Sequence, residues 1–208
     1  MIIILLKQEK TLNLLKKYKI NVPKYKIIRN QNIKITKFPV ILKINSNEVL
    51  HKTDLGLIYT NLHNKNEVLD AYKKIKLNTK KHKIKFNSII SQEYINGIEV
   101  IVGFKRDSQF GNVFLFGLGG IFTEVLKDFS LRINPNKNEI IKMIKEIKGY
   151  KVLEGYRTHR KININYIVNI ILKLEKLVSH DSHIKEINLN PVIINEKGAY
   201  VVDAKIIV

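Results

Sequence analysis

The sequence of 208 residues contains no cysteine. This absence excludes disulfide bonds, zinc fingers and catalysis by a thiol group. Long apolar runs are also missing, because the start, MIIILLKQEK, holds only one short run with no cationic region before it. Such a run is too short for a signal peptide or a membrane span, so we expect a cytoplasmic protein. No low-complexity segment indicates disorder, and the length suits one large domain or two small ones.

Acidic residues are scarce, with 18 Asp and Glu against 37 Lys and Arg, which gives a net charge of +19. Residues 1–90 hold 20 basic and 5 acidic side chains, a net charge of +15, whereas residues 91–208 hold 17 and 13, a net charge of +4. A basic half can bind nucleic acid or an acidic partner. The lysines are spread along predicted helices, however, and few aromatic residues interleave with them. We therefore expect a nucleotide or an acidic protein as partner rather than nucleic acid.

The spacing of apolar residues predicts a chain of helices and short strands without internal repeats. Helical periodicity covers residues 5–19, 66–77, 138–148 and 163–178. Strands are predicted over residues 25–28, 38–44, 57–62, 88–94, 99–103 and 113–116. The lysine-rich segment 80–85 is predicted to be a solvated turn.

The most informative stretch covers residues 38–56, FPVILKINSNEVLHKTDLG. A predicted strand ends on Lys43 and opens into a polar loop that holds His51 and Gly56. The strand fixes the lysine, while small residues let backbone N–H groups approach phosphate oxygens closely. His51 can accept a phosphoryl group, because neutral imidazole is a nucleophile near pH 7. This stretch therefore indicates a polyphosphate site.

A glycine-rich segment, Gly117-Leu118-Gly119-Gly120, follows the strand predicted over residues 113–116. Its spacing is not that of a dinucleotide fingerprint, because Phe122 stands where a third glycine is needed. A glycine-rich loop directly after a strand is still a usual place to bind phosphate. The alternative is that the glycines only allow a sharp turn from strand to helix.

Asn190 and Asp203 stand on the two arms of a hairpin predicted near the end of the chain, with its turn at residues 196–198. An amide oxygen and a carboxylate that face each other suit Mg²⁺, which keeps waters and takes its remaining ligands from ATP phosphates. The alternative is local, since Asn190 before Pro191 can shape a turn and Asp203 can form a local hydrogen bond.

Four segments, in this order, resemble the β subunits of ADP-forming acetyl-CoA synthetase, also called acetate–CoA ligase. They are VILKINSNEVLHKTDLG, SQEYINGIEVIVGFKRDSQFG, FGLGGIFTEVLKD, and EINLNPV with VVDAK. The resemblance covers essentially the whole chain. It implies an α+β, ATP-grasp fold in which two α+β subdomains clamp a nucleotide. Residues 1–90 would form a small subdomain with the His51 loop, and residues 91–208 a large subdomain with the glycine loop and the metal-binding hairpin.

The motifs of this family also imply a role for each matching residue. His51 would be the catalytic phosphohistidine. The nucleotide-binding residues would be Lys43 at the phosphates, Gly56 in the small-subdomain loop, Glu93 and Tyr94 beside adenine, and Glu99 at the ribose. The phosphate loop would comprise Gly117, Gly119 and Gly120, and the metal ligands would be Asn190 and Asp203. One departure stands out, because Leu57 occupies the place where the family loop usually carries a second glycine.

The resemblance implies the reaction acyl-CoA + ADP + phosphate ⇌ acid + CoA + ATP, with Mg²⁺ as cofactor and ADP or ATP as substrate. The CoA-binding and acyl-binding domains would lie on a partner α subunit, in a heterotetramer of two α and two β chains. One alternative is a β subunit like that of succinyl-CoA synthetase, against which the H-K-T-D segment argues. The other is a basic, non-catalytic module that binds nucleotide, RNA or an acidic protein through residues 65–85. The intact set of site residues argues against that module.

Overall fold

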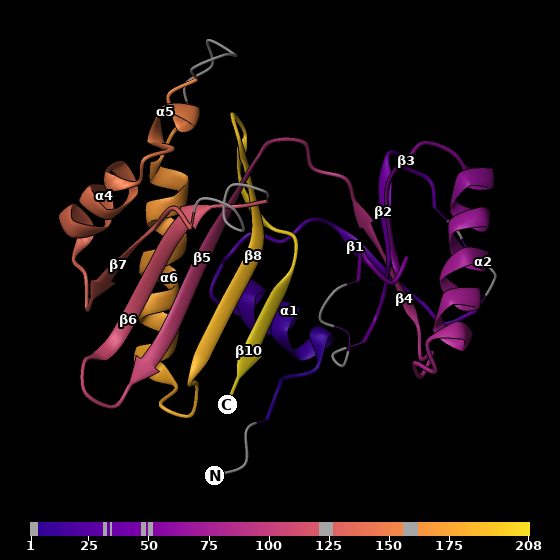
Figure 1. Ribbon diagram of the computed structural model, residues 1–208, viewed down its shortest axis with the longest axis horizontal. Coiled ribbons are helices and arrows are strands. Elements are labelled where there is room, and N and C mark those ends of the chain that lie inside the picture. The colour runs from indigo at the N-terminus through magenta and orange to yellow at the C-terminus, as the bar shows by residue number, and fades with distance from the viewer. Residues whose placement is uncertain are drawn as a thin grey trace. The chain divides into compact units, whose positions relative to one another are not determined.

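The computed structural model describes residues 4–30, 33, 35–46, 49, 52–120, 127–155 and 162–208. The chain forms two compact units, which Figure 1 shows coloured along the sequence. We call the segment Pro23–Ile95 the four-stranded unit. Met1–Val22 and Asn96–Val208 together make up the six-stranded unit. The chain therefore leaves the six-stranded unit once and then returns to it.

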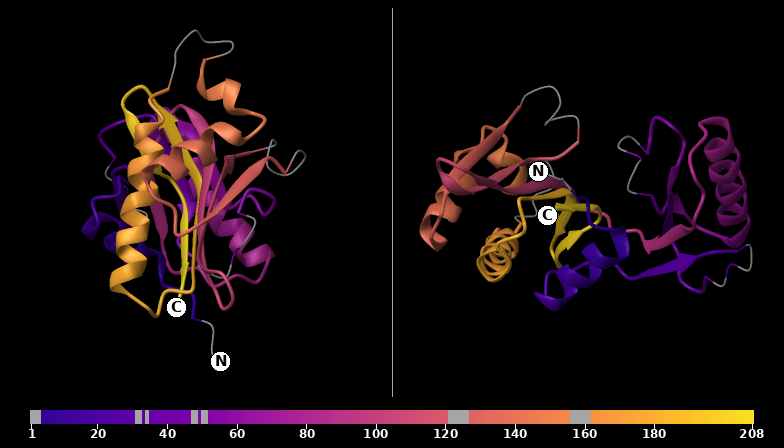
Figure 2. Two further views of the ribbon diagram at one scale, coloured as in Figure 1. Left: turned by 90° about the vertical axis from the view of Figure 1, so that its left-hand side faces the viewer. Right: turned by 90° about the horizontal axis from the view of Figure 1, so that it is seen from below.

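An antiparallel sheet and one helix form the four-stranded unit. The strand order is β1 (Tyr25–Ile28), β4 (Ile89–Glu93), β2 (Val40–Ile44) and β3 (Ile58–Leu62). Helix α2 (Lys65–Lys81) covers one face of this sheet (Figures 1 and 2). Alternate side chains of a strand point to opposite faces. Leu42 therefore packs with Ile75 of α2 in the core, whereas Lys43 lies on the opposite face.

The six-stranded unit is built on a second antiparallel sheet, in the order β10-β8-β5-β6-β7, with β9 paired to β8. The strands are β5 (Ile98–Asp107), β6 (Gly111–Leu118), β7 (Phe129–Ile133), β8 (Glu186–Asn195), β9 (Gly198–Val201) and β10 (Ala204–Ile207). The helices are α1 (Gln8–Lys17), α4 (Lys137–Glu146), α5 (Tyr150–Leu153) and α6 (Asn165–His180). Helices α4 and α6 lie on the same face of the sheet (Figure 2), and one apolar core joins them to it.

Two helices begin at side-chain caps that are visible in the sequence. Asn64 caps α2, because its side chain accepts the backbone N–H of Glu67 at 3.0 Å. Helix α4 begins with a capping box formed by Asn136 and Glu139. Such caps satisfy N–H groups that have no partner within the first turn of a helix. The N-terminal ends of these helices are thus determined by residues within the first turn.

The division of the chain differs from the expected boundary between residues 90 and 91. Helix α1 contacts β10, so the first 22 residues belong to the six-stranded unit although they precede the four-stranded unit in sequence. Strand β4 pairs with both β1 and β2, which extends the four-stranded unit to Ile95. Both differences arise from contacts between segments that are far apart along the chain.

The structure confirms the mixture of helices and strands, and its class is α+β. Helix α2 continues to Lys81, through part of the segment predicted as a lysine-rich turn. Strand β7 was not expected, although its residues alternate between apolar and polar. In the structure the apolar residues Phe129, Leu131 and Ile133 are exposed, whereas Ser130 is buried. None of the helices in the described ranges is long and apolar enough to cross a bilayer.

Candidate functional site

Lys43 lies on β2, an inner strand of the four-stranded sheet. It pairs with Ile90 of β4 on one side and with Ile58 of β3 on the other. Only 3 % of its surface is exposed, which is rare for a lysine. Two neighbouring strands therefore fix the backbone of this lysine, and its side chain is directed to the sheet face that α2 does not cover.

Residues 52–57 form a tight turn after the predicted phosphohistidine, His51, which itself lies outside the described residues. The N–H group of Gly56 donates to the carbonyl oxygen of Thr53 at 2.9 Å. Gly56 has a φ of +60°, a left-handed conformation that favours glycine. A Cβ atom at this position would also lie 2.5 Å from the side-chain nitrogen of Asn78 on α2. The left-handed backbone therefore favours glycine here, and any side chain would force Asn78 to move.

Leu57 stands where the family loop usually has its second glycine. The turn nevertheless stays tight, because two backbone hydrogen bonds of Leu57 hold it. Its N–H group donates to Lys52 at 2.8 Å, and its carbonyl oxygen accepts the N–H group of Ile44 at 2.9 Å. The side chain is fully buried in the core of the four-stranded unit. The leucine thus anchors the end of the turn and holds it beside the strand that carries Lys43.

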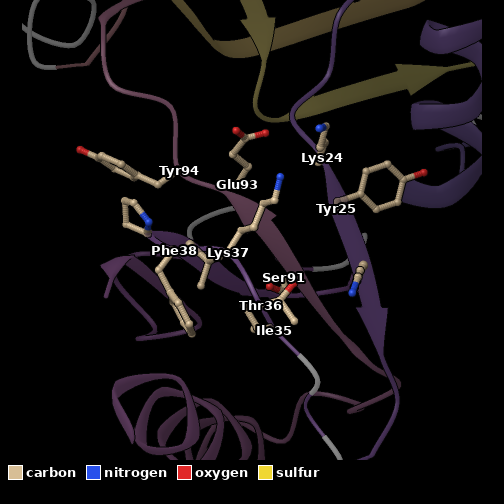
Figure 3. Close-up of a pocket in the computed structure, with 12 residues that line it drawn as sticks. Lys24, Tyr25, Ile35, Thr36, Lys37, Phe38, Ser91, Glu93 and Tyr94 are labelled. Atoms are coloured by element: carbon tan, nitrogen blue, oxygen red, sulfur yellow. The ribbon is translucent and has the colours of Figure 1, made fainter. Parts of the chain in front are cut away.

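A pocket of about 320 Å³ opens on the four-stranded unit, lined by Glu93 and Tyr94 (Figure 3). The N–H group of Glu93 donates to the carbonyl oxygen of Lys24 at 2.8 Å, and that of Tyr94 donates to Pro39 at 3.1 Å. These bonds tie the end of β4 to the segments before β1 and β2. Lys43 does not line this pocket.

The pocket combines an apolar wall with charged groups. Ile35 and Phe38 contribute apolar surface. In Figure 3, the ammonium groups of Lys24 and Lys37 and the carboxylate of Glu93 point to one side, whereas the ring of Phe38 points away from them. An apolar wall with a few convergent polar groups is typical of a small-molecule site. Glu93 was predicted from its motif, whereas Lys24 and Lys37 belong to no recognisable motif, and Phe38 begins the stretch 38–56 without an expected role in a pocket.

Glu99 meets the glycine-rich loop within the six-stranded unit. Its carbonyl oxygen accepts the N–H group of Gly119 at 2.7 Å. A Cβ atom on Gly119 would lie 2.9 Å from Cβ of Glu99, and one on Gly120 would lie 3.2 Å from its carboxylate oxygen Oε2. Gly117 instead lies inside β6, opposite Phe129 of β7. Two of the three predicted loop glycines therefore follow the strand, and residues 121–126 lie outside the described part of the chain.

Of the two predicted metal ligands, Asn190 lies on β8 and Asp203 lies in the bend between β9 and β10. The N–H group of Asn190 donates to the carbonyl oxygen of Asp203 at 3.1 Å, where β8 changes its partner from β10 to β9. The Oδ1 atom of Asp203 accepts from the side chain of Gln8 at 3.4 Å and from the N–H group of Ala204 at 3.2 Å.

This donor set fits Mg²⁺, because Mg²⁺ binds one or two protein oxygens and takes its other ligands from phosphate and water. Within the described ranges, no three His, Cys, Asp or Glu side chains gather as a metal site. As metal ligands, Asn190 and Asp203 would provide only part of a coordination shell and would leave the rest to a bound nucleotide.

The predicted site residues fall into two groups, one in each unit. The four-stranded unit holds Lys43, the turn that contains Gly56, and the pocket beside Glu93 and Tyr94. The six-stranded unit holds Glu99, Gly117, Gly119, Gly120, Asn190 and Asp203.

Sequence comparison matches residues 4–208 to the ATP-grasp domain family. Subunit beta of acetate–CoA ligase (ADP-forming) I from Pyrococcus furiosus is 40 % identical over 203 residues, which cover 93 % of this chain and 88 % of that subunit. Acetate–CoA ligase (ADP-forming) II from Archaeoglobus fulgidus is 39 % identical over 210 residues, which cover 98 % of this chain but 30 % of that protein. The same module thus occurs as a nearly complete subunit and as less than a third of a longer chain.

Solved structures of acetyl-coenzyme A synthetase 1 from Ca. Korarchaeum cryptofilum are also similar. A complex with coenzyme A, Ca-AMPCP and HgCl+ gives a TM-score of 0.90 at 35 % identity, covering 98 % of this chain and 93 % of that one. A complex with coenzyme A and Mg-AMPPCP, in which a phosphohistidine segment points towards the nucleotide binding site, gives 0.81 at 35 % identity, covering 98 % and 92 %. Both matches extend over the two units of this chain.

Proposed function

This chain belongs to the ATP-grasp family and, within it, to the β subunits of ADP-forming acetate–CoA ligases, and on that basis we propose that it binds the nucleotide in a ligase that makes ATP from acyl-CoA, ADP and phosphate. The membership confirms the predicted ATP-grasp fold and ligase class. One observation supports the phosphate chemistry most directly. The bond of 2.9 Å between Ile44 and Leu57 holds the turn after His51 beside the strand of Lys43.

The proposed reaction transfers a phosphoryl group in steps whose atoms balance. Phosphate attacks the carbonyl carbon of acyl-CoA and releases CoA, which leaves an acyl phosphate. A histidine nitrogen of the partner subunit attacks its phosphorus, and the free acid leaves. The group then passes to an imidazole nitrogen of His51 and from there to a β-phosphate oxygen of ADP, which yields ATP and neutral His51.

The nucleotide is assigned to residues from both units. The apolar pocket beside Glu93 and Tyr94 would take adenine, and Glu99 would bind the ribose hydroxyls. Lys43 would contact the phosphates, because its ammonium group offsets negative charge in a site from which water is largely excluded. Gly56, Gly119 and Gly120 would allow the backbone to approach phosphate oxygens closely.

Asn190 and Asp203 would hold Mg²⁺, which supplies positive charge to the transferring phosphoryl group. The likeness to a relative solved with Mg-AMPPCP supports this assignment.

We assign the four-stranded unit as the small ATP-grasp subdomain, with the His51 loop. The six-stranded unit is the large subdomain, with the glycine loop and the metal-binding hairpin.

The acyl-CoA half of the reaction is assigned to a partner α subunit. The Pyrococcus furiosus relative is named a subunit beta, and the Archaeoglobus fulgidus relative extends far beyond this module, which supports a second component. We propose an assembly of two α and two β chains in the cytoplasm. Without the partner, this chain should bind ADP but not complete the reaction.

The test of this function is phosphorylation of the chain by γ-labelled ATP with Mg²⁺, with and without an α subunit. Wild type is compared with His51→Ala and with a matched control, His63→Ala. His63 is an exposed histidine of the same unit, between β3 and α2, with no assigned role. We expect acid-labile label in wild type and in His63→Ala and none in His51→Ala, because a phosphohistidine is hydrolysed in acid.

Label that survives in His51→Ala would place the carrier on another residue and end the relay proposal. Absence of label together with intact ADP binding would leave a nucleotide-binding subunit without the relay. Failure to bind ADP with Mg²⁺ at all would refute the nucleotide site itself. The alternative of a basic module that binds nucleic acid is tested by measuring RNA binding at rising salt concentration. Binding through the lysines of α2 should be lost as the salt concentration rises.

A further inference from the structure

Apolar side chains are exposed in a row along one edge of the six-stranded sheet. Strand β7 ends the strand order of this sheet, and Figure 1 shows it at the edge. Its residues Phe129, Leu131 and Ile133 are 48 %, 47 % and 50 % exposed. Seven large apolar side chains are exposed within the described ranges, and four of them are these three and Phe110, in the turn before β6. Single exposed apolar residues are common in soluble proteins, whereas a group of them marks a binding surface.

Strand pairing continues this row onto β6 and β5. The three side chains lie opposite residues of β6, in the pairs Phe129–Gly117, Leu131–Leu115 and Ile133–Val113, and Ile101 of β5 lies opposite Gly117. The alternate residues Phe114 and Phe116 are buried in the core with α4 and α6. The row therefore lies on the sheet face that these helices do not cover. We call its exposed and half-buried side chains the apolar edge patch, which comprises Ile101, Val113, Leu115, Phe129, Leu131 and Ile133.

Strand β7 carries no charged side chain on this face. Its basic residue, Arg132, points to the other face, where it donates a hydrogen bond to Glu146 of α4, and Ser130 is buried. Natural edge strands are usually protected from other chains by charged side chains or proline. Because β7 lacks this protection on its open face, the apolar edge patch is suited to be covered by another chain.

Glu99 connects the patch with the proposed nucleotide site. It lies two residues before Ile101 on β5, and residues two positions apart point to the same face of a sheet. In the proposed reaction, the phosphoryl group reaches the nucleotide from a partner subunit. A partner that docks on the patch is thus placed on the face that carries Glu99, the residue assigned to the ribose.

The charge of the chain favours a different protein over a second copy as the occupant of the patch. Two copies would each bring a net charge of +19, and a large net charge of one sign keeps proteins monomeric. Helix α4, which contacts β7, adds the exposed lysines Lys137, Lys142 and Lys145 beside the patch. The matching surface therefore has an apolar centre and an acidic rim.

We propose that the apolar edge patch is the surface on which the partner α subunit docks. The inference rests on the proposed function, to which the α subunit belongs. The related module is a separate subunit beta in Pyrococcus furiosus but covers only 30 % of a longer protein in Archaeoglobus fulgidus, which supports a partner that stays attached to this module. A stable interface involves about 20–30 residues on each side, so the six residues of the patch form its centre, where most of the binding free energy is concentrated.

The test measures the affinity of the full chain for the α subunit of an ADP-forming acetate–CoA ligase from the same organism. Titration calorimetry compares wild type, Leu131→Glu and a matched control, Leu77→Glu. Leu77 is also an exposed leucine, but it lies on α2 of the four-stranded unit. We expect Leu131→Glu to weaken α-subunit binding about thirtyfold or more, because it places a negative charge in the apolar centre. Leu77→Glu should leave the affinity unchanged, and neither substitution should change ADP binding.

A milder substitution at the same strand keeps the test decisive if Leu131→Glu fails to fold, which circular dichroism detects. Ile133→Thr retains a residue that favours strands and removes apolar contact, so it should weaken α-subunit binding severalfold. The salt dependence tests the acidic rim separately. Association of the wild-type chain with the α subunit should slow as the salt concentration rises, and a rate that does not depend on salt overturns the acidic rim.

Equal α-subunit affinity in wild type, Leu131→Glu and Ile133→Thr overturns the inference, as does a wild-type chain that does not bind the α subunit. Light scattering of the chain alone tests the other occupant. Dimers of wild type that become monomers in Leu131→Glu, with α-subunit affinity unchanged, would assign the patch to a second copy and overturn the inference. ADP binding reports on the proposed function separately, since a chain that docks through the patch but binds no ADP refutes the nucleotide site alone.

Discussion

Replacing Leu57 by alanine should destabilise the four-stranded unit far more than a surface substitution of the same kind. The side chain is fully buried, and the backbone bonds to Lys52 and Ile44 hold its main chain in place. The core therefore cannot collapse readily into the space that the missing methyl groups leave. Leucine-to-alanine substitutions at such sites cost about 3 kcal/mol or more. In a unit of this size, that loss lowers the melting temperature by more than about 10 °C.

Leu77→Ala is the matched control, since Leu77 is 66 % exposed on α2 of the same unit. Its stability should change by less than about 0.5 kcal/mol. Scanning calorimetry of the full chain measures both variants, and urea unfolding followed by circular dichroism gives the free energies. Similar losses in the two variants, or a loss below about 1 kcal/mol for Leu57→Ala, would refute the idea that Leu57 anchors the turn.

Three further substitutions probe the six-stranded unit. Gly97→Ala should cost about 1–3 kcal/mol, because its Cβ atom would lie 2.4 Å from the backbone oxygen of Ile194, whereas Gly103→Ala, with its nearest neighbour at 3.4 Å, should be tolerated. Urea unfolding distinguishes them, and equal stability would contradict the reasoning. Hydrogen bonds from the N–H groups of Phe110 and Gln109 lower the pKa of Asp107 in the folded chain. The stability that these bonds provide is therefore fully present above the unfolded pKa of about 3.9, and it is lost as the pH falls through the lower pKa of the folded chain. Asp107→Asn should therefore melt below wild type at pH 7 and together with it in strong acid, and a difference that does not depend on pH would argue against this cause.

Much of the local structure could be predicted from the sequence because its causes are local. The short apolar runs within β2 and β5 predicted strands, and the apolar period of residues 138–148 and 163–178 predicted α4 and α6. The turn after His51 could be anticipated from its small and charged residues. Strand β7 was missed although its residues alternate between apolar and polar, and its apolar residues Phe129, Leu131 and Ile133 are the exposed ones.

The candidate site was predicted only where its residues belong to a motif. Lys43, Gly56, Glu99, Asn190 and Asp203 each stand in one. Lys24 and Lys37 do not, and they join Glu93 at the pocket only because β4 runs between β1 and β2. Nothing in the sequence around Lys24 indicates that its carbonyl oxygen accepts the N–H group of Glu93, a residue almost 70 positions later.

By itself, the sequence determined the kinds of local structure and the chemical groups available, since helix caps, strand alternation and glycine turns depend on neighbours within a few residues. Only the tertiary structure decided that α1 joins the six-stranded unit and that Leu57 replaces a glycine by anchoring its turn in the core. Each of these depends on which strands pair and in which register. Strand pairing joins residues that are distant in the chain, so no short stretch of sequence contains the information that fixes it.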